Sequence, residues 1–249
     1  MKDLISADII RILRKPSYRI LLLISFLLVA YVAIKTRFDV WDGYQYTSRQ
    51  YTMMELAGEL LLGIMIYLSV YADEFTSNSM QVIIGRGVSR FRLILSKFVN
   101  CVVISFISFA AYTALVLILG IILGAGMTGE EAFFILLSGM NCAVKTIGFS
   151  TISMIVLYAT RNVALATLTD VILTASYNLW GGLFDMIPWI KFIHPERVFF
   201  SGAVDIASAN LMLGNRAAFF IIIFQLVKVS AISILISYLI FRKKELEFF

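Results

Sequence analysis

FVNCVVISFISFAAYTALVLILGIIL, residues Phe98–Leu123, contains no charged side chain and exceeds the roughly 20 apolar residues that a membrane-spanning helix needs. Five other apolar runs of spanning length accompany it, at Tyr18–Ile34, Glu55–Tyr71, Ala132–Tyr158, Val163–Phe184 and Ala217–Phe241. An open chain crosses lipid only as helices, because every backbone polar group must then be paired internally. The sequence therefore predicts an all-α integral membrane protein with six transmembrane helices.

The composition excludes a soluble protein. Hydrophobic residues make up 60% of the chain and charged residues 15%, whereas soluble domains are nearer half apolar and a quarter charged. A chain of 249 residues holds about six spanning helices with short loops and little else. Residues 17–249 are therefore predicted to form one six-helix transmembrane domain.

Lysine and arginine orient the predicted helices, because cytoplasmic loops carry an excess of these residues. With the N-terminus inside, the inner segments hold thirteen Lys and Arg residues and the outer segments hold six. Both termini and the loop at residues 72–97 are therefore predicted to lie in the cytoplasm. The net charge of +5 is thus interpreted as a mark of membrane orientation rather than of nucleic-acid binding.

The segment before the first run, MKDLISADIIRILRKP (residues 1–16), has the pattern of an amphipathic helix. Ile5, Ile9 and Ile12 share one face, and basic residues spread over the rest, as in helices that lie on a membrane surface. Pro16 then ends this helix and sets the entry of the first span. An interfacial helix on the inner membrane surface is therefore predicted.

The segment at residues 185–216 is too long for a tight turn between two spans. It mixes apolar patches with Pro188, Pro195, Gly202 and Gly214. Irregular backbone at membrane depth is tolerated only where protein covers it or it lines a water-filled cavity. We expect short re-entrant helices that enter the outer leaflet before the last span.

Several catalytic and ligand-binding motifs are absent from the sequence. It contains no GxxxxGK[ST] nucleotide loop, no HExxH, no GxSxG and no EF-hand pattern. The two cysteines and the one histidine show no metal-ligand spacing. No catalytic residue and no metal site is predicted, and the chain is not expected to be an enzyme.

Charged residues inside the apolar runs are a further signal. Glu59, Lys145, Asp170 and Lys228 fall within predicted spans. An unpaired charge at mid-bilayer costs a few kcal/mol or more, so we expect these two acids and two bases to pair. The alternative interpretation is that these charged residues form a polar site along a transport pathway. The fifth run adds polar residues expected at a helix interface or a pathway, namely Thr167, Thr174, Tyr177 and Asn178.

The loop at residues 72–97, ADEFTSNSMQVIIGRGVSRFRLILSK, contains more ordered sequence features than a simple connection between two spans needs. It opens with the acidic pair Asp73–Glu74 and continues through a short apolar-periodic segment into a basic stretch. Gly85 and Gly87 allow a tight reversal, and Ser89 can cap the following helix. Such a loop is typical of docking onto a soluble partner.

Together these features resemble the permease subunits of type-2 ATP-binding-cassette exporters, as in bacterial peptide, antibiotic and bacteriocin-immunity transporters. The resemblance rests on the amphipathic segment before six spans, the loop motif GVSR (Gly87–Arg90) following Glu74, the Lys97 that heads the third span, the long outer segment and the tail FRKKELEF. It covers essentially the whole chain. The loop departs from the usual pattern at Thr76–Ser79, where members often carry Gly-Thr.

The resemblance implies a multi-pass subunit of the bacterial cytoplasmic membrane that forms half of an export pathway with a second copy or a sister permease. A separate cassette ATPase would hold ATP and Mg²⁺, so this chain would carry no cofactor. The loop would contain the coupling helix that docks on that ATPase, and the residues expected there are Asp73, Glu74, Phe75, Met80, Ile84, Gly85, Gly87, Ser89 and Arg90.

The fifth span offers hydroxyl and aromatic side chains rather than a dense ring of charge. The resemblance implies export of an amphipathic molecule, and with such a span the expected substrate is a peptide, toxin or antibiotic. The alternative function is a secondary carrier or channel, which would use the intramembrane charges for ion coupling.

Overall fold

The computed structural model describes residues 2–39, 42–76, 79–186 and 199–243, and every regular element among them is a helix. The elements are α1 (Lys2–Arg14), α2 (Pro16–Asp39), α3 (Gly43–Met53), the π-helical η1 (Met54–Leu62), α4 (Gly63–Tyr67), the π-helical η2 (Leu68–Ala72), α5 (Asp73–Thr76), α6 (Ser79–Gly85), α7 (Arg90–Ile122), α8 (Gly129–Thr160), α9 (Val163–Met186), α12 (Phe200–Met212) and α13 (Ala217–Lys243).

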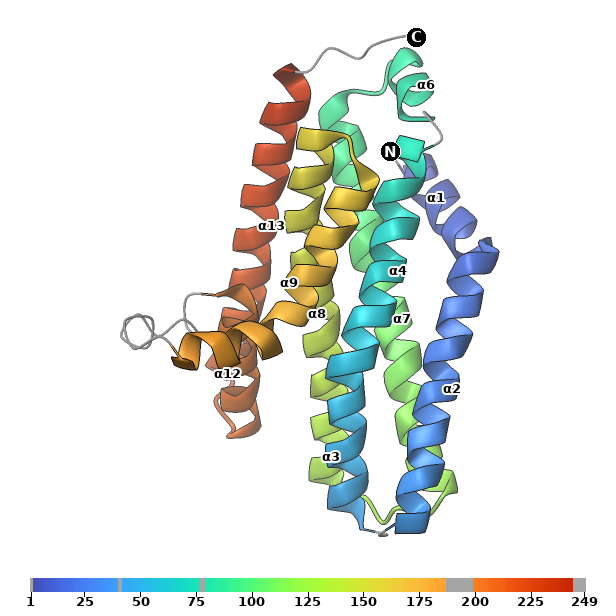
Figure 1. Cartoon of the computed structure of the whole chain (residues 1–249), viewed down its shortest axis with the longest axis vertical. Helices are drawn as coiled ribbons and strands as arrows, with labels where there is room; N and C mark the ends of the chain where they lie inside the picture. Colours follow the sequence, from blue (N-terminus) through green and yellow to red (C-terminus); the bar gives the residue numbers. More distant parts are fainter. Residues whose placement is uncertain (1, 40–41, 77–78, 187–198, 244–249) are drawn as a thin grey trace.

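The long helices form an elongated bundle (Figure 1). Within the described residues, five helices are long and apolar enough to cross a membrane, namely Pro16–Arg37, Gly43–Ala72, Arg90–Ile122, Gly129–Thr160 and Ala217–Lys243. The chain is therefore an all-helical, multi-pass membrane protein. The predicted fifth span lies in α9, whose apolar stretch within the described part is the shorter Val163–Ala175, so the count of six spans stays a prediction.

Two of the helices extend beyond the predicted span limits. The second spanning helix begins at Gly43 rather than at Glu55, because the polar residues of α3 that interrupt the hydropathy, such as Gln50, are buried against protein. The third begins at Arg90 rather than at Phe98, because the side chain of Ser89 accepts a hydrogen bond from the backbone N–H of Arg92 and caps α7. The loop predicted at residues 72–97 therefore ends where α7 begins.

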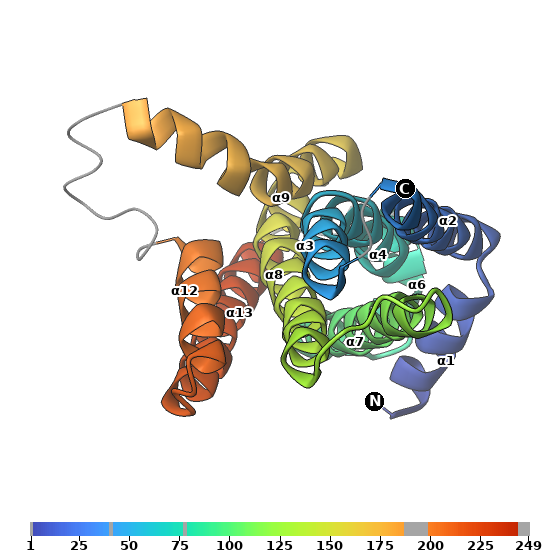
Figure 2. The same cartoon turned by 90° about the horizontal axis from the view of Figure 1, so that it is seen from below.

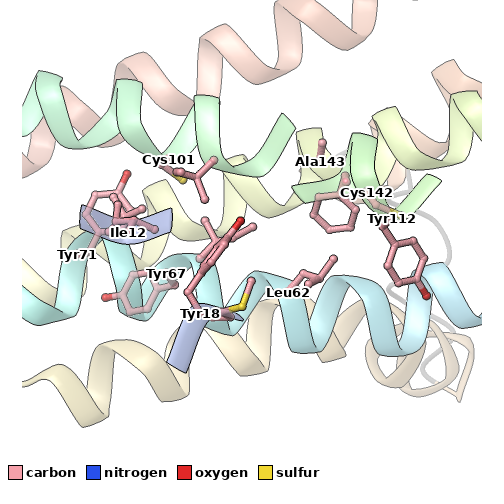
Figure 3. Close-up of a cluster of buried hydrophobic side chains, with 14 of the residues drawn as sticks. Ile12, Tyr18, Leu62, Tyr67, Tyr71, Cys101, Tyr112, Cys142 and Ala143 are labelled. Atoms are coloured by element: carbon pink, nitrogen blue, oxygen red, sulfur yellow. The ribbon is translucent and has the colours of Figure 1, made fainter. Parts of the chain in front are cut away.

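Helix α8 is the central element of the bundle, with α7, α3, α9 and the α12–α13 pair around it (Figure 2). A Cβ atom on Gly139 would lie 2.0 Å from Thr113 Oγ1, so α7 and α8 cross at a distance that only glycine permits. Large buried side chains, among them Tyr18, Tyr67 and Tyr112, fill the space between the helices (Figure 3). Because protein covers α8 on most sides, polar residues along it meet other helices rather than lipid.

Helix α12 is the described part of the predicted outer re-entrant segment, and residues 187–198 lie outside the description. The ring of Phe200 occupies the place of a side chain at Gly148 of α8, where a Cβ atom would be 2.1 Å from Phe200 Cε1. Phe149 contacts the same ring edge to face, with the ring centroids 6.0 Å apart. This contact fixes α12 against the middle of α8, whatever its depth in a membrane.

The predicted amphipathic helix is α1, and a buried ion pair holds it to the bundle. Asp8 of α1 accepts a hydrogen bond from the ammonium of Lys97 in α7, and Lys97 is only 2% exposed. Asn100 donates to the same carboxylate at 3.1 Å, and Arg11 lies 3.4 Å from its other oxygen. No local sequence pattern marks Asp8, because its partners Lys97 and Asn100 come from a distant segment.

The ion pair between Asp8 of α1 and Lys97 of α7 leads to a prediction about stability. Replacing Asp8 with Ala removes a buried charge-assisted hydrogen bond from Lys97 and the acceptor of Asn100, which should lower the free energy of unfolding by about 2–3 kcal/mol. Lys15→Ala removes a pair that is about 30% exposed on both sides and should cost about 1 kcal/mol or less. Unfolding by sodium dodecyl sulfate in mixed micelles measures both values, and equal losses would contradict the anchoring role of Asp8.

Candidate functional site

One group of predicted site residues lies where α1, α5 and α6 meet the start of α7 and the ends of α8 and α13, which we name the loop end (Figure 1). Asp73, at the start of α5, binds the ammonium of Lys15 at 2.7 and 2.8 Å and lies 3.4 Å from Arg11. The first residue of α5 therefore joins the loop to Arg11 of α1 and to Lys15, which directly follows α1. The side chain of Glu74 lies outside the described part of the structure.

A row of contacts links this loop to three long helices. The ring of Phe75 in α5 meets Tyr158 near the end of α8, with the centroids 5.3 Å apart, and Tyr158 meets Phe241 of α13 at 4.9 Å. Arg90 at the start of α7 donates to the carbonyls of Phe241 and Arg242 at 2.8 and 3.0 Å. Its guanidinium also lies 5.4 Å from the Phe241 ring. We call Phe75, Tyr158, Phe241 and Arg90 the aromatic row.

The turn after α6 has the predicted form. Gly87 has a φ of 88°, which glycine adopts without strain. Its N–H donates to Ile84 and that of Val88 donates to Ile83, which is the Schellman ending of a helix. Met80 is buried and Ile84 is half-buried on the bundle, while residues 85–87 are exposed. Helix α6 thus has one side packed on the bundle and an exposed end.

A second group surrounds Lys145, which lies about 23 Å from either end of α8 at a rise of about 1.5 Å per residue. Its ammonium nitrogen is 3.2 Å from Glu59 Oε1, 2.9 Å from Asp205 Oδ1 and 3.5 Å from Glu55 Oε1. Asn141 donates to Asp205 Oδ1 at 2.7 Å. We call Glu55, Glu59, Asn141, Lys145 and Asp205 the Lys145 cluster.

Of the pairing expected between the two intramembrane acids and the two bases, the structure shows a contact between Glu59 and Lys145. The contributions of Glu55 and Asp205 were missed. Glu55 stood at the predicted edge of a span, although its spacing of four residues from Glu59 places both on one helical face. Asp205 comes from α12, so no local signal connects it with α8.

The other predicted intramembrane residues do not join this cluster. Asp170 is buried in α9 and accepts a hydrogen bond from Ser153 at 3.2 Å, with no ion pair among the described residues. Lys228 is exposed on α13 and forms no ion pair within the same residues, so the predicted pairing of these two charges is not found. Thr167 and Thr174 donate to backbone carbonyls of α9 itself. The side chains of Tyr177 and Asn178 lie outside the description.

No group of three or more His, Cys, Asp and Glu side chains in the part of the chain that the structure describes is arranged to hold a metal ion.

The helices and their buried charges define an all-α, multi-pass membrane protein. Within that class, the chain belongs to the DUF2705 family, described as a protein of unknown function, whose model matches residues 6–246. No curated protein and no solved structure matches the chain.

The Lys145 cluster makes a prediction about coupling between charges. Lys145→Met leaves three carboxylates near one another at mid-bundle and should lower the free energy of unfolding by about 3–5 kcal/mol. Adding Glu59→Gln should restore part of that loss, because it removes one uncompensated charge. A double-mutant cycle measured by unfolding in mixed micelles should give a coupling free energy of roughly 1–3 kcal/mol.

Lys228→Met is the control for that cycle. Its side chain is exposed and forms no described ion pair, so its removal should change the free energy of unfolding by no more than about 0.5 kcal/mol. Additive effects of Lys145→Met and Glu59→Gln would contradict the pairing.

Proposed function

We propose that this chain is the membrane permease subunit of an ATP-driven exporter in the bacterial cytoplasmic membrane, with both termini in the cytoplasm. The proposal rests on the contacts that connect the helices at the loop end. A short helix with an exposed end, α6, follows a segment that is joined to α1 through Asp73 and to α8, α13 and α7 through the aromatic row. A force that a bound partner applies to α6 would therefore be transmitted to four helices of the bundle, α1, α7, α8 and α13.

Charge supports the orientation. The loop end gathers Arg11, Lys15, Arg90, Arg161 and Arg242 on α1 and at the ends of long helices. Basic residues at one end of a membrane bundle mark its cytoplasmic side. A docking surface for a cytoplasmic ATPase is needed at that side, since the sequence has no GxxxxGK[ST] loop.

The intramembrane charges support a pathway shared with a second permease subunit. The side chains of Glu55 and Asp205 are 24% and 20% exposed, although they lie beside Lys145 in the middle of α8. Carboxylates at such a depth face water or another protein rather than lipid. A second copy or a sister permease facing this edge would enclose a polar conduit, and an amphipathic peptide, toxin or antibiotic fits a conduit with both polar and apolar walls.

An ion-coupled carrier is the second candidate, because the cluster places three carboxylates around one ammonium. The two candidates differ in their energy source. Transport into vesicles that needs the ATPase and ATP supports the exporter, whereas transport driven by an ion gradient in its absence supports the carrier.

A site-specific crosslink tests the docking surface. A photoreactive benzoylphenylalanine at position 86, which is exposed beside the end of α6, should crosslink to a cassette ATPase encoded in the adjacent reading frame and produced together with this chain. The same group at position 130 is the control, because Glu130 is exposed at the far end of α8. A crosslink at 130 only, or at neither position, would overturn the proposed docking.

The aromatic row makes a separate prediction. Tyr158→Leu removes both ring contacts of Tyr158 and should lower transport per ATP hydrolysed by about threefold or more, within the roughly 0.5–2 kcal/mol that such networks carry. The ATPase should still copurify. Phe91→Leu is the matched control, since the ring of Phe91 contacts Tyr238 of α13 at the same end and belongs to none of the ring contacts of the aromatic row. Equal losses in both variants would argue against the row.

A further inference from the structure

The Lys145 cluster carries more negative charge than its lysine balances. Glu55, Glu59 and Asp205 supply three carboxylates, and Lys145 is the one basic side chain within 4 Å of them among the described residues. The three N–H donors of that ammonium match the three carboxylates, so each acid receives one donor at most from it. A surplus of negative charge remains at mid-bundle, where charge is costly unless it is compensated.

The polar atoms of the cluster that lack a partner are all acceptors. Asp205 Oδ2 is buried and accepts no hydrogen bond. Asn141 is 5% exposed, and its Oδ1 has no partner although its amide nitrogen already donates to Asp205. The bond from its amide nitrogen to Asp205 shows that the Asn141 side chain is directed at the cluster. A buried acceptor without a donor costs about 1–3 kcal/mol, so the site lacks a donor.

The cluster has a buried base and a partly exposed rim. The side chains of Lys145 and Glu59 are 4% and 6% exposed, whereas those of Glu55 and Asp205 are 24% and 20% exposed. The rim residues come from η1 and α12, two elements that flank α8. A cationic group attached to a larger molecule can therefore reach the rim without entering the core.

We propose that Glu55, Asp205 and Asn141 form a binding site for the guanidinium or ammonium group of an amphipathic ligand, with the Lys145–Glu59 pair as its base. The ligand offsets the surplus charge through charge-assisted hydrogen bonds with the partly exposed rim carboxylates. The identification of this ligand with the exported molecule rests on the proposed function. The binding itself does not, because it needs no ATPase.

A pair of probes of nearly the same shape tests the site. One is a dansyl-labelled octylguanidinium, and the other is the matched octylurea, which has no charge. Fluorescence titration of the purified full-length chain in phosphatidylcholine nanodiscs, with empty nanodiscs subtracted, should show binding of the guanidinium at least about tenfold tighter than binding of the urea, as expected for charge-assisted hydrogen bonds. Equal affinities on the unmodified protein would overturn the proposal.

Variants then locate the binding. Glu55→Gln and Asp205→Asn preserve size and remove one rim charge each, and each should weaken guanidinium binding by about tenfold while leaving urea binding unchanged. Glu130→Gln is the control, because it removes a carboxylate at the far end of α8, outside the cluster. Unchanged guanidinium affinity in both rim variants would overturn the site.

A sodium titration separates an organic cation from a free metal cation. At constant ionic strength, with N-methylglucamine replaced stepwise by Na⁺, guanidinium affinity should stay constant. Displacement by Na⁺ at millimolar concentration would assign the site to an inorganic ion and overturn the proposal. Failure of the ATPase crosslink with intact guanidinium binding would remove the exporter assignment and leave this site standing.

Discussion

The ammonium of Lys145 is the constraint on which the middle of the bundle depends. A lysine about 23 Å from either end of a central helix can neither reach water nor stay unpaired. Its carboxylates come from η1 and from α12, so satisfying one charge fixes two other elements against α8. The contact of Phe200 with Gly148 sets the same placement of α12 by shape, and Asp205 projects from that helix toward Lys145.

At the loop end, the groups that need partners are backbone carbonyls at helix ends rather than a buried ammonium. There the long helices terminate with carbonyls that no following turn can pair, and Arg90 binds the carbonyls of Phe241 and Arg242 near the end of α13. Ring contacts rather than charges then join α13 to α8, and α8 to α5. Aromatic contacts at the membrane surface tolerate small displacements, whereas the ion pairs at mid-bundle hold a fixed geometry.

Local pattern predicted most of the helices and part of the site. Apolar runs identified five spanning helices, because lipid leaves the chain no other backbone solution, and the loop chemistry identified Ser89 as a cap and Gly87 as a turn. The charges of Glu59 and Lys145 within apolar runs indicated a buried pairing but not which base Glu59 would contact. Gly43 was missed as the start of a span because burial by protein, not hydropathy, makes Gln50 acceptable there. Asp8 and Asp205 were missed because their partners, Lys97 and Lys145, are brought to them by tertiary packing alone.

Helix α8 connects the two regions. Tyr158 of the aromatic row and Lys145 lie on this one helix, about 20 Å apart along its axis, and the helix has no break between them. Asp205, by contrast, belongs to α12, which has no residue in the aromatic row, whereas Glu55 and Phe75 lie on one unbroken helical stretch, residues 43–76. A shift of α8 imposed at Tyr158 would therefore move Lys145 and Asn141 together relative to Asp205. Because charge-assisted hydrogen bonds weaken steeply with distance and angle, such a shift would change the affinity of the rim for a cation, which is the relation between ATPase docking and substrate binding that an exporter requires.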